Sequence, residues 1–193
     1  MPQGVARQAR ILQTARRATT RRTAPLLPLP GPFGVTRTRR SAQQDVRLRK
    51  PLERSLRSGH PWLFRDALEA FEALPGTPVR VLDKSGRFLA VGLAEAGPIG
   101  VRVFSLRDEA VDAALFGARI ARAFALRARC VPEQTDAYRL LHGEGDGLPG
   151  FVCDRYGSAA VLKLDGEAAP AIANSFTQAL TPLLEQQGVR SLI

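Results

Sequence analysis

The stretch Pro78-Val79-Arg80-Val81-Leu82-Asp83-Lys84-Ser85-Gly86-Arg87-Phe88-Leu89-Ala90-Val91-Gly92 decides how the middle of this chain folds. Apolar residues flank Asp83-Lys84-Ser85-Gly86 on both sides, and Asp and Gly are typical of a tight hairpin turn. The pattern therefore predicts two strands, Thr77 to Leu82 and Arg87 to Ala94, joined by this turn.

The segments around this hairpin predict a small β module. Gly100 to Leu106 has the composition of a third strand, and Val46 and Leu48 alternate with Arg47 and Arg49 as in a short strand. Pro51 to Ser58 permits a short helix that stops at Gly59. Three or four strands with one short helix indicate a small barrel-like fold.

Asp108 to Arg129 gives the clearest helical pattern in the sequence. Phe116, Ile120 and Phe124 recur every four residues and form an apolar stripe. Arg119, Arg122 and Arg129 fall within roughly 80° of one another at about 100° per residue. We favour a solvated helix face for this cationic stripe, and arginines that contact phosphates are the alternative.

A second unit follows this helix. Its predicted elements are three strands, a helix and a strand: Ala137 to His142, Phe151 to Tyr156, Ala159 to Leu164, Ala168 to Gln187 and Val189 to Ile193. The predicted fold class is α+β, a small β-barrel followed by a small α/β domain. We divide the chain into a disordered Arg-rich extension (1–44), the β module (45–107), a connecting helix (108–130) and the α/β domain (131–193).

The positive charge belongs to the N-terminal quarter. Of the overall net charge of +10, residues 1–50 contribute +11 and residues 51–193 contribute −1. A high isoelectric point therefore does not by itself make the rest of the chain a nucleic-acid binder, and any such contact must come from local clustering.

Residues 1–44 allow three interpretations. They could be a basic arm that binds RNA by counterion release, an organelle transit peptide, or an extension translated from a start site assigned too early. We favour the third, because an excess of Arg over Lys fits a GC-rich genome in which leader sequence would resemble this segment. Such a segment is expected to be disordered.

Composition excludes several classes of protein. Cys130 and Cys153 are too few for a disulfide scaffold, and with His60 and His142 they give no zinc-ligand spacing. We therefore expect no metal site and a reducing, cytoplasmic setting. No apolar run reaches the 18 residues that a membrane span needs, so we expect a soluble protein with no membrane partner.

The segment Gly145-Asp146-Gly147-Leu148-Pro149-Gly150 matches G-x-G-x-x-G, the pattern of dinucleotide and S-adenosylmethionine loops. That loop needs a helix after it, whereas Phe151 to Tyr156 is strand-like, and Glu144 and Asp146 would repel a phosphate. We interpret the glycines as residues with positive φ in a tight hairpin. The two acids could form a general acid/base pair or a Mg²⁺ site, but acids in a turn are more often solvated.

Gly59-His60-Pro61-Trp62 admits a structural and a functional interpretation. Trp62 is more often a core residue, since so large a ring is seldom left exposed. Beside Arg54, Arg57 and Arg65 an exposed Trp62 could instead stack on a nucleobase.

Several of these segments together resemble the RlmI-type ribosomal large-subunit methyltransferases, over about residues 45–193. The resemblance is carried by the order and spacing of the segments 46–50, 53–56, 59–64, 78–83, 86–92, 138–140, 143–150 and 154–156, which begin with Val46-Arg47-Leu48-Arg49-Lys50 and end with Asp154-Arg155-Tyr156. It implies a PUA domain, an RNA-binding β module, near residues 46–107, and a small α/β domain near residues 131–193.

The resemblance also implies a chemistry that this chain would not perform alone. Family members use S-adenosylmethionine to methylate C5 of a cytosine in 23S-type rRNA, with a cofactor loop and a nucleophilic Cys in a further Rossmann-like domain. The chain ends where that domain would begin, and neither Cys130 nor Cys153 matches the nucleophile. We therefore expect no catalytic or cofactor-binding residue here, and interpret both thiols as inert packing residues.

The expected function is the RNA-binding portion of an rRNA cytosine-5 methyltransferase, with large-subunit rRNA as its partner. Three alternatives stay open: the first piece of a split gene with a separate catalytic chain, a free-standing RNA-binding module, and a non-functional remnant. The RNA-binding candidates are six cations for phosphates and two rings for a base: Arg47, Arg49, Lys50, Arg54, Arg57 and Arg87, with His60 and Trp62.

Overall fold

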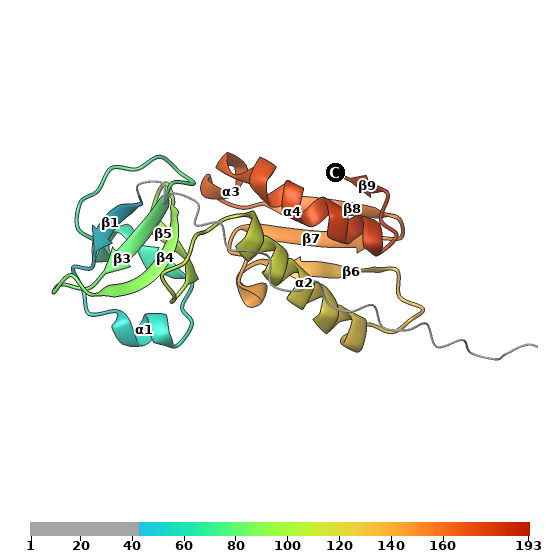
Figure 1. Cartoon of the computed structure of the whole chain (residues 1–193), viewed down its shortest axis with the longest axis horizontal. Helices are drawn as coiled ribbons and strands as arrows, with labels where there is room; N and C mark the ends of the chain where they lie inside the picture. The colour runs from blue at the N-terminus through green and yellow to red at the C-terminus, as the bar shows by residue number, and fades with distance from the viewer. Residues whose placement is uncertain (1–42) are drawn as a thin grey trace, which may run out of the picture. The chain divides into compact units, whose positions relative to one another are not determined.

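The computed structural model describes residues 43–193, and its N-terminal part is a five-stranded sheet with one short helix (Figure 1). The strand order is β1-β3-β4-β5-β2, with β1 parallel to β3 and the other pairs antiparallel. The elements are β1 (Gln44–Arg47), α1 (Glu53–Arg57), β2 (Trp62–Phe64), β3 (Pro78–Leu82), β4 (Phe88–Ala94) and β5 (Ile99–Ser105).

The predicted strands 77–82, 87–94 and 100–106 are confirmed to within one residue at each end. Alternation explains them, because every second side chain meets the core: Val79 and Val81 are fully buried while Arg80 between them is half-buried. Strand β2 was not predicted. The expected disordered extension lies outside the described residues, except that its last residue, Gln44, belongs to β1.

Helix α2 (Ala113–Cys130) follows β5 and starts five residues later than predicted. Asp112 sets this start as the N-cap, because its side chain accepts hydrogen bonds from the backbone N–H of Ala114 (3.0 Å) and Leu115 (3.1 Å). The predicted apolar stripe is confirmed, since Phe116, Ile120 and Phe124 are all buried.

The C-terminal part is a four-stranded sheet with the order β6-β7-β8-β9. Its strands are β6 (Ala137–His142), β7 (Phe151–Tyr156), β8 (Ala159–Leu164) and β9 (Ser191–Leu192). The single helix predicted over 168–187 is two helices, α3 (Ala168–Ala171) and α4 (Ala173–Gln186), because Ile172 leaves helical geometry at φ −114° and ψ 11°. The strand predicted to extend to Ile193 covers Ser191–Leu192 only.

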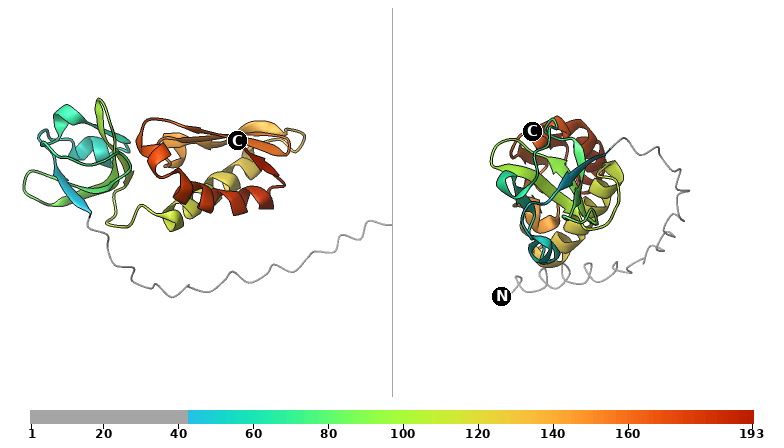
Figure 2. Two further views of the ribbon diagram at one scale, coloured as in Figure 1. Left: turned by 90° about the horizontal axis from the view of Figure 1, so that it is seen from above. Right: turned by 90° about the vertical axis from the view of Figure 1, so that its left-hand side faces the viewer.

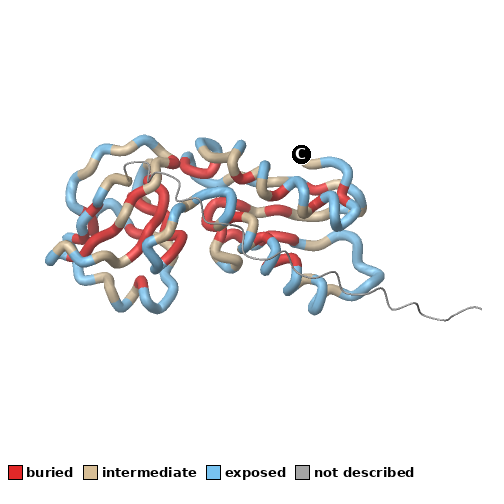
Figure 3. The backbone as a smooth tube through the Cα atoms, viewed as in Figure 1, coloured by how far each residue is buried: buried red, intermediate tan, exposed pale blue. Residues whose placement is uncertain are grey.

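Helices α2 and α4 lie side by side on one face of the four-stranded sheet (Figure 2). The core between them is aromatic: the rings of Phe151 and Phe176 stack with centroids 3.7 Å apart, and Phe116 packs against both. Buried segments follow the strands of both sheets and the inner faces of both helices (Figure 3). Leu93 and Phe104, from β4 and β5, also pack into this second core.

The fold class is therefore confirmed as α+β, while the predicted domain boundaries stay predictions. Among residues 43–193, no helix is long and apolar enough to cross a bilayer.

Candidate nucleic-acid interface

An open, largely apolar pocket of about 730 Å³ lies on the five-stranded module beside the 3-10 helix Arg65–Ala67. Phe64 lines it and is 45% exposed. Lys50 and Arg65 also line it and supply positive charge. An exposed ring beside cations is a combination on which unpaired nucleobases stack.

The cations of this pocket are held in place. Arg65 donates from Nε to the carbonyl of Gly97 (3.1 Å), and its guanidinium lies 5.3 Å from the centre of the Phe71 ring. Lys50 donates from Nζ to Asp66 (2.6 Å), and this hydrogen bond lowers the pKa of the Asp66 carboxyl. Of the predicted residues only Lys50 lines the pocket, and Arg49 is exposed nearby, within electrostatic reach of Asp66.

The sequence interpretation missed Phe64, and it named Arg65 only as a cation near Trp62 and not among the RNA-binding candidates. The signal was present in Trp62-Leu63-Phe64: Leu63 is 1% exposed, so strand alternation turns both neighbours to the other face. This alternation is not apparent without β2, which the sequence pattern does not predict.

Arg47 and Arg87 both lie at the hairpin turn. A Cβ added at Gly86 would lie 3.5 Å from Nη1 of Arg47, so this guanidinium faces the turn. Arg87 donates from Nε to Asp83 (2.7 Å), which also accepts from Oγ of Ser85 (2.6 Å). These bonds hold the pKa of Asp83 well below its usual value, with the Ser85 bond the largest cause. The Arg87 side chain stays 76% exposed despite this pair.

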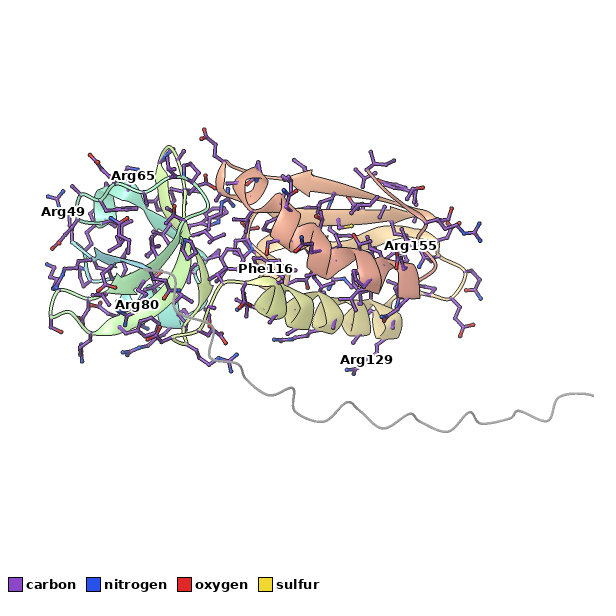
Figure 4. All side chains as sticks on the ribbon, turned by 45° about the horizontal axis from the view of Figure 1, so that its top comes forward. Arg49, Arg65, Arg80, Phe116, Arg129 and Arg155 are labelled. Carbon is purple, nitrogen blue, oxygen red and sulfur yellow. The ribbon has the colours of Figure 1, made fainter. Side chains whose placement is uncertain are left out.

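Arg54 and Arg57 lie three residues apart on α1 and therefore share one side of the helix. Both are exposed, and neither side chain has a hydrogen bond or ion pair with another described residue. His60 is exposed just beyond α1. The structure thus places the candidates in separate groups on one module, and Figure 4 shows Arg49 and Arg65 on it.

Trp62 is not a core residue, contrary to the favoured interpretation. It is half-buried, and its indole Nε1 donates to Glu144 (3.1 Å) in the loop after β6. The His60 ring meets it edge-on with centroids 6.3 Å apart. Its indole N–H is therefore already used in a contact with the C-terminal part of the chain.

The expectation that Glu144 and Asp146 are solvated acids is wrong. The Asp146 side chain is 8% exposed and accepts from both Nη atoms of Arg127, each at 2.7 Å. It also accepts from the backbone N–H of His142 (2.6 Å). Glu144 accepts from Arg102 (3.1 Å) as well as from Trp62. Partners far apart in sequence bind both carboxylates, and the composition of the turn does not reveal these contacts.

Arg102, on β5, is the centre of a buried ionic network. It donates to Glu95 (2.7 Å), Asp165 (2.8 Å) and Glu144, and its side chain is 4% exposed. Burial alone raises the pKa of Glu95, but hydrogen bonds from Arg102 and from three backbone N–H groups outweigh it and lower that pKa. Since Glu95 also accepts from the N–H of Ala168, the network joins the β module to the start of α3.

Strand β7, and not a helix, follows the segment 145–150, as the sequence predicts. Gly147 (φ +71°) and Gly150 (φ +88°) have the expected positive φ. The segment before β7 is a 3-10 helix, Gly143–Asp146, and a loop, rather than a tight hairpin.

The two thiols differ. Cys153 is fully buried in the second core, which confirms its packing role, and burial raises the pKa of its thiol to about 12. Cys130 is exposed at the end of α2, so its expected packing role is wrong. Within the described part of the chain, no three His, Cys, Asp or Glu side chains gather as metal ligands.

Residues 46–106, which form most of the five-stranded module, match the model of the PUA-like domain family. The chain is also related in sequence to ribosomal RNA large subunit methyltransferases, which confirms the resemblance noted above. It is 38% identical over 128 residues to one from Deinococcus radiodurans, covering 62% of this chain and 31% of that protein. It is 38% identical over 144 residues to ribosomal RNA large subunit methyltransferase I of Cronobacter sakazakii, covering 70% and 36%.

The chain spans about a third of the length of the curated relatives it matches. A solved structure of a Streptococcus mutans protein assigned as a SAM-dependent methyltransferase has the same fold over this part, with a TM-score of 0.67 and 16% identity. That match covers 77% of this chain and 40% of the other.

Proposed function

We propose that this chain is the RNA-recognition portion of a large-subunit rRNA methyltransferase and that residues 43–193 bind rRNA without holding S-adenosylmethionine or transferring a methyl group. A catalytic domain, on this or a separate polypeptide, supplies the methyl transfer. The cytoplasm is the expected place of action.

The observation that carries this proposal is the Phe64 pocket on the PUA-like domain, with cations around it. The Phe64 ring is 45% exposed beside Lys50 and Arg65 and offers a flat apolar face for stacking with a nucleobase. Arg54 and Arg57 add charge that no described acid neutralises, which suits contacts to phosphates.

Replacing both helix arginines, as Arg54→Ala with Arg57→Ala, tests the RNA-binding half. Affinity for a large-subunit rRNA fragment should fall at low salt. If each arginine meets one phosphate of a duplex, the slope of log K against log salt should become shallower by about 1.8. Fluorescence anisotropy across a salt series measures both quantities with the full chain.

The matched control removes two exposed cations elsewhere, as Lys163→Ala with Arg190→Ala. This control variant loses the same two positive charges as the α1 variant, and its affinity for the rRNA fragment should stay closer to that of the unsubstituted chain. Equal losses in the two double variants would contradict a specific role for α1.

Titration with S-adenosylmethionine tests the second half. The chain should release no binding heat in calorimetry, because the glycine segment 143–150 precedes a strand instead of opening a helix. Stoichiometric binding would overturn this part of the proposal and leave the RNA-binding part standing.

A further inference from the structure

A second cationic surface lies in a groove of about 550 Å³ between α2 and residues 145–147, and Phe104 at the end of β5 also lines this groove. Arg119, Arg122 and Arg129 line the helix side of this groove, and Gly145, Asp146 and Gly147 line the loop side. Helix α2 carries arginines but no acidic residue in its 18 residues.

We infer that this groove is a second binding site for the phosphodiester backbone of RNA, contacted by Arg122 and Arg129 with Arg119 beside them. The inference rests on the proposed RNA-binding function and extends it to the C-terminal part of the chain.

The charge of the groove is not neutralised from within. Asp146 is the acid among its lining residues, and Arg127 already holds both of its carboxylate oxygens. Arg122 and Arg129 are exposed and have no hydrogen bond or ion pair with another residue of 43–193. Arg129 projects from the end of α2 in Figure 4. The lining therefore keeps a net positive charge, to which a polyanion is attracted.

Arg119 distinguishes this groove from an ordinary solvated helix face. Arg119 is half-buried, and its guanidinium donates to the backbone carbonyls of Gly147 and Phe104, while no carboxylate of residues 43–193 is bonded to it. Burial lowers its pKa, which measures the cost of holding this charge away from water. A ligand anion would offset that cost.

The loop is shaped to admit this arginine. Gly147 has φ +71°, and a Cβ there would lie 3.2 Å from Nη1 of Arg119. A side chain at position 147 would therefore be strained and would crowd the guanidinium.

The spacing of the arginines suits a chain of phosphates. Arg119 and Arg129 are ten residues apart and so are separated by about 15 Å along the helix axis. A stacked strand that rises about 3.4 Å per nucleotide places roughly four phosphates along that length. Leu126, 48% exposed between the arginines, offers an apolar surface for a sugar or base.

The test uses the full chain with the double substitution Arg122→Ala and Arg129→Ala and a labelled single-stranded RNA oligonucleotide of mixed sequence. Two lost contacts should make the slope of log K against log salt shallower by about 1.4. Circular dichroism and the urea midpoint should not change, because both side chains are exposed and unpaired. The double variant of Lys163 and Arg190 is the matched control.

The outcomes separate this inference from the proposed function. If the groove variant matches the control while the Arg54 and Arg57 variant binds more weakly, the groove inference is wrong and the proposed function stands. If the unsubstituted chain binds no RNA at low salt, both fail.

Inorganic phosphate is the second probe. If the site needs several linked phosphates, inorganic phosphate should displace bound RNA no more effectively than chloride does at equal ionic strength. Displacement by far less phosphate than chloride would instead make the groove a small-anion site and overturn the assignment to RNA.

Discussion

Two ion pairs of nearly equal length lie in contrasting surroundings. Lys50 and Asp66 are 2.6 Å apart at the rim of the Phe64 pocket, where their side chains are 54% and 72% exposed. Arg102 and Glu95 are 2.7 Å apart, where their side chains are 4% and 2% exposed. Distance alone predicts similar contributions to the free energy of unfolding, but exposure to solvent decides how much each pair contributes.

The two pairs show the difference between charges that are buried within the fold and charges that a ligand can reach. Solvent and external ions do not reach the buried pair, so removing either Arg102 or Glu95 leaves the other charge buried without a partner. The exposed pair competes with water and salt at all times, so a phosphate could replace Asp66 beside Lys50 at little cost. By the same reasoning, Arg54, Arg57, Arg122 and Arg129 are more available to RNA than Arg102 or Arg127.

Breaking the buried pair should have the largest effect on stability. Arg102→Ala leaves the Glu95 carboxylate buried without its guanidinium partner, and also frees Asp165 and Glu144. The free energy of unfolding should fall by about 3–5 kcal/mol. Urea denaturation at neutral pH measures the loss, with the exposed substitution Arg190→Ala as the control.

A loss under about 1 kcal/mol in that experiment would mean that the network adds little beyond the cost of burying it. The double variant Arg102→Met with Glu95→Gln keeps the test informative if Arg102→Ala does not fold. Removing both charges should restore much of the free energy of unfolding that Arg102→Ala loses, because neither position 95 nor position 102 then carries an unpaired buried charge.

The fold was largely predictable, because its signals are local. Alternation in 78–92 predicts β3 and β4, and the stripe of Phe116, Ile120 and Phe124 predicts α2. Strand β2 was missed because three residues between a Pro and a 3-10 helix are too few for a periodic pattern. The break at Ile172 was missed because no Gly or Pro stands at that position.

The candidate site was only partly predictable, because its residues meet through tertiary contacts. Arg102 interrupts an apolar strand, Gly100-Val101-Arg102-Val103-Phe104, and a charge there is a signal of a buried partner. Its partner Glu144 is 42 residues away, and nothing in a turn of glycines and acids indicates that contact. The availability of each arginine likewise depends on partners distant in sequence.

Removing the exposed pair should have the smallest effect on stability and a selective effect on binding. Lys50→Ala should leave the urea midpoint where it is, because Lys50 and Asp66 are both well solvated. RNA affinity should fall, with a salt slope shallower by about 0.7 to 0.9 for one lost phosphate contact. Anisotropy beside urea denaturation checks both, with the exposed substitution Lys163→Ala, away from the RNA-binding candidates, as the control. A shifted urea midpoint would contradict the claim that the exposed Lys50–Asp66 pair contributes little to stability. Unchanged binding would remove Lys50 from the interface and leave the Phe64 ring and the α1 arginines to carry it.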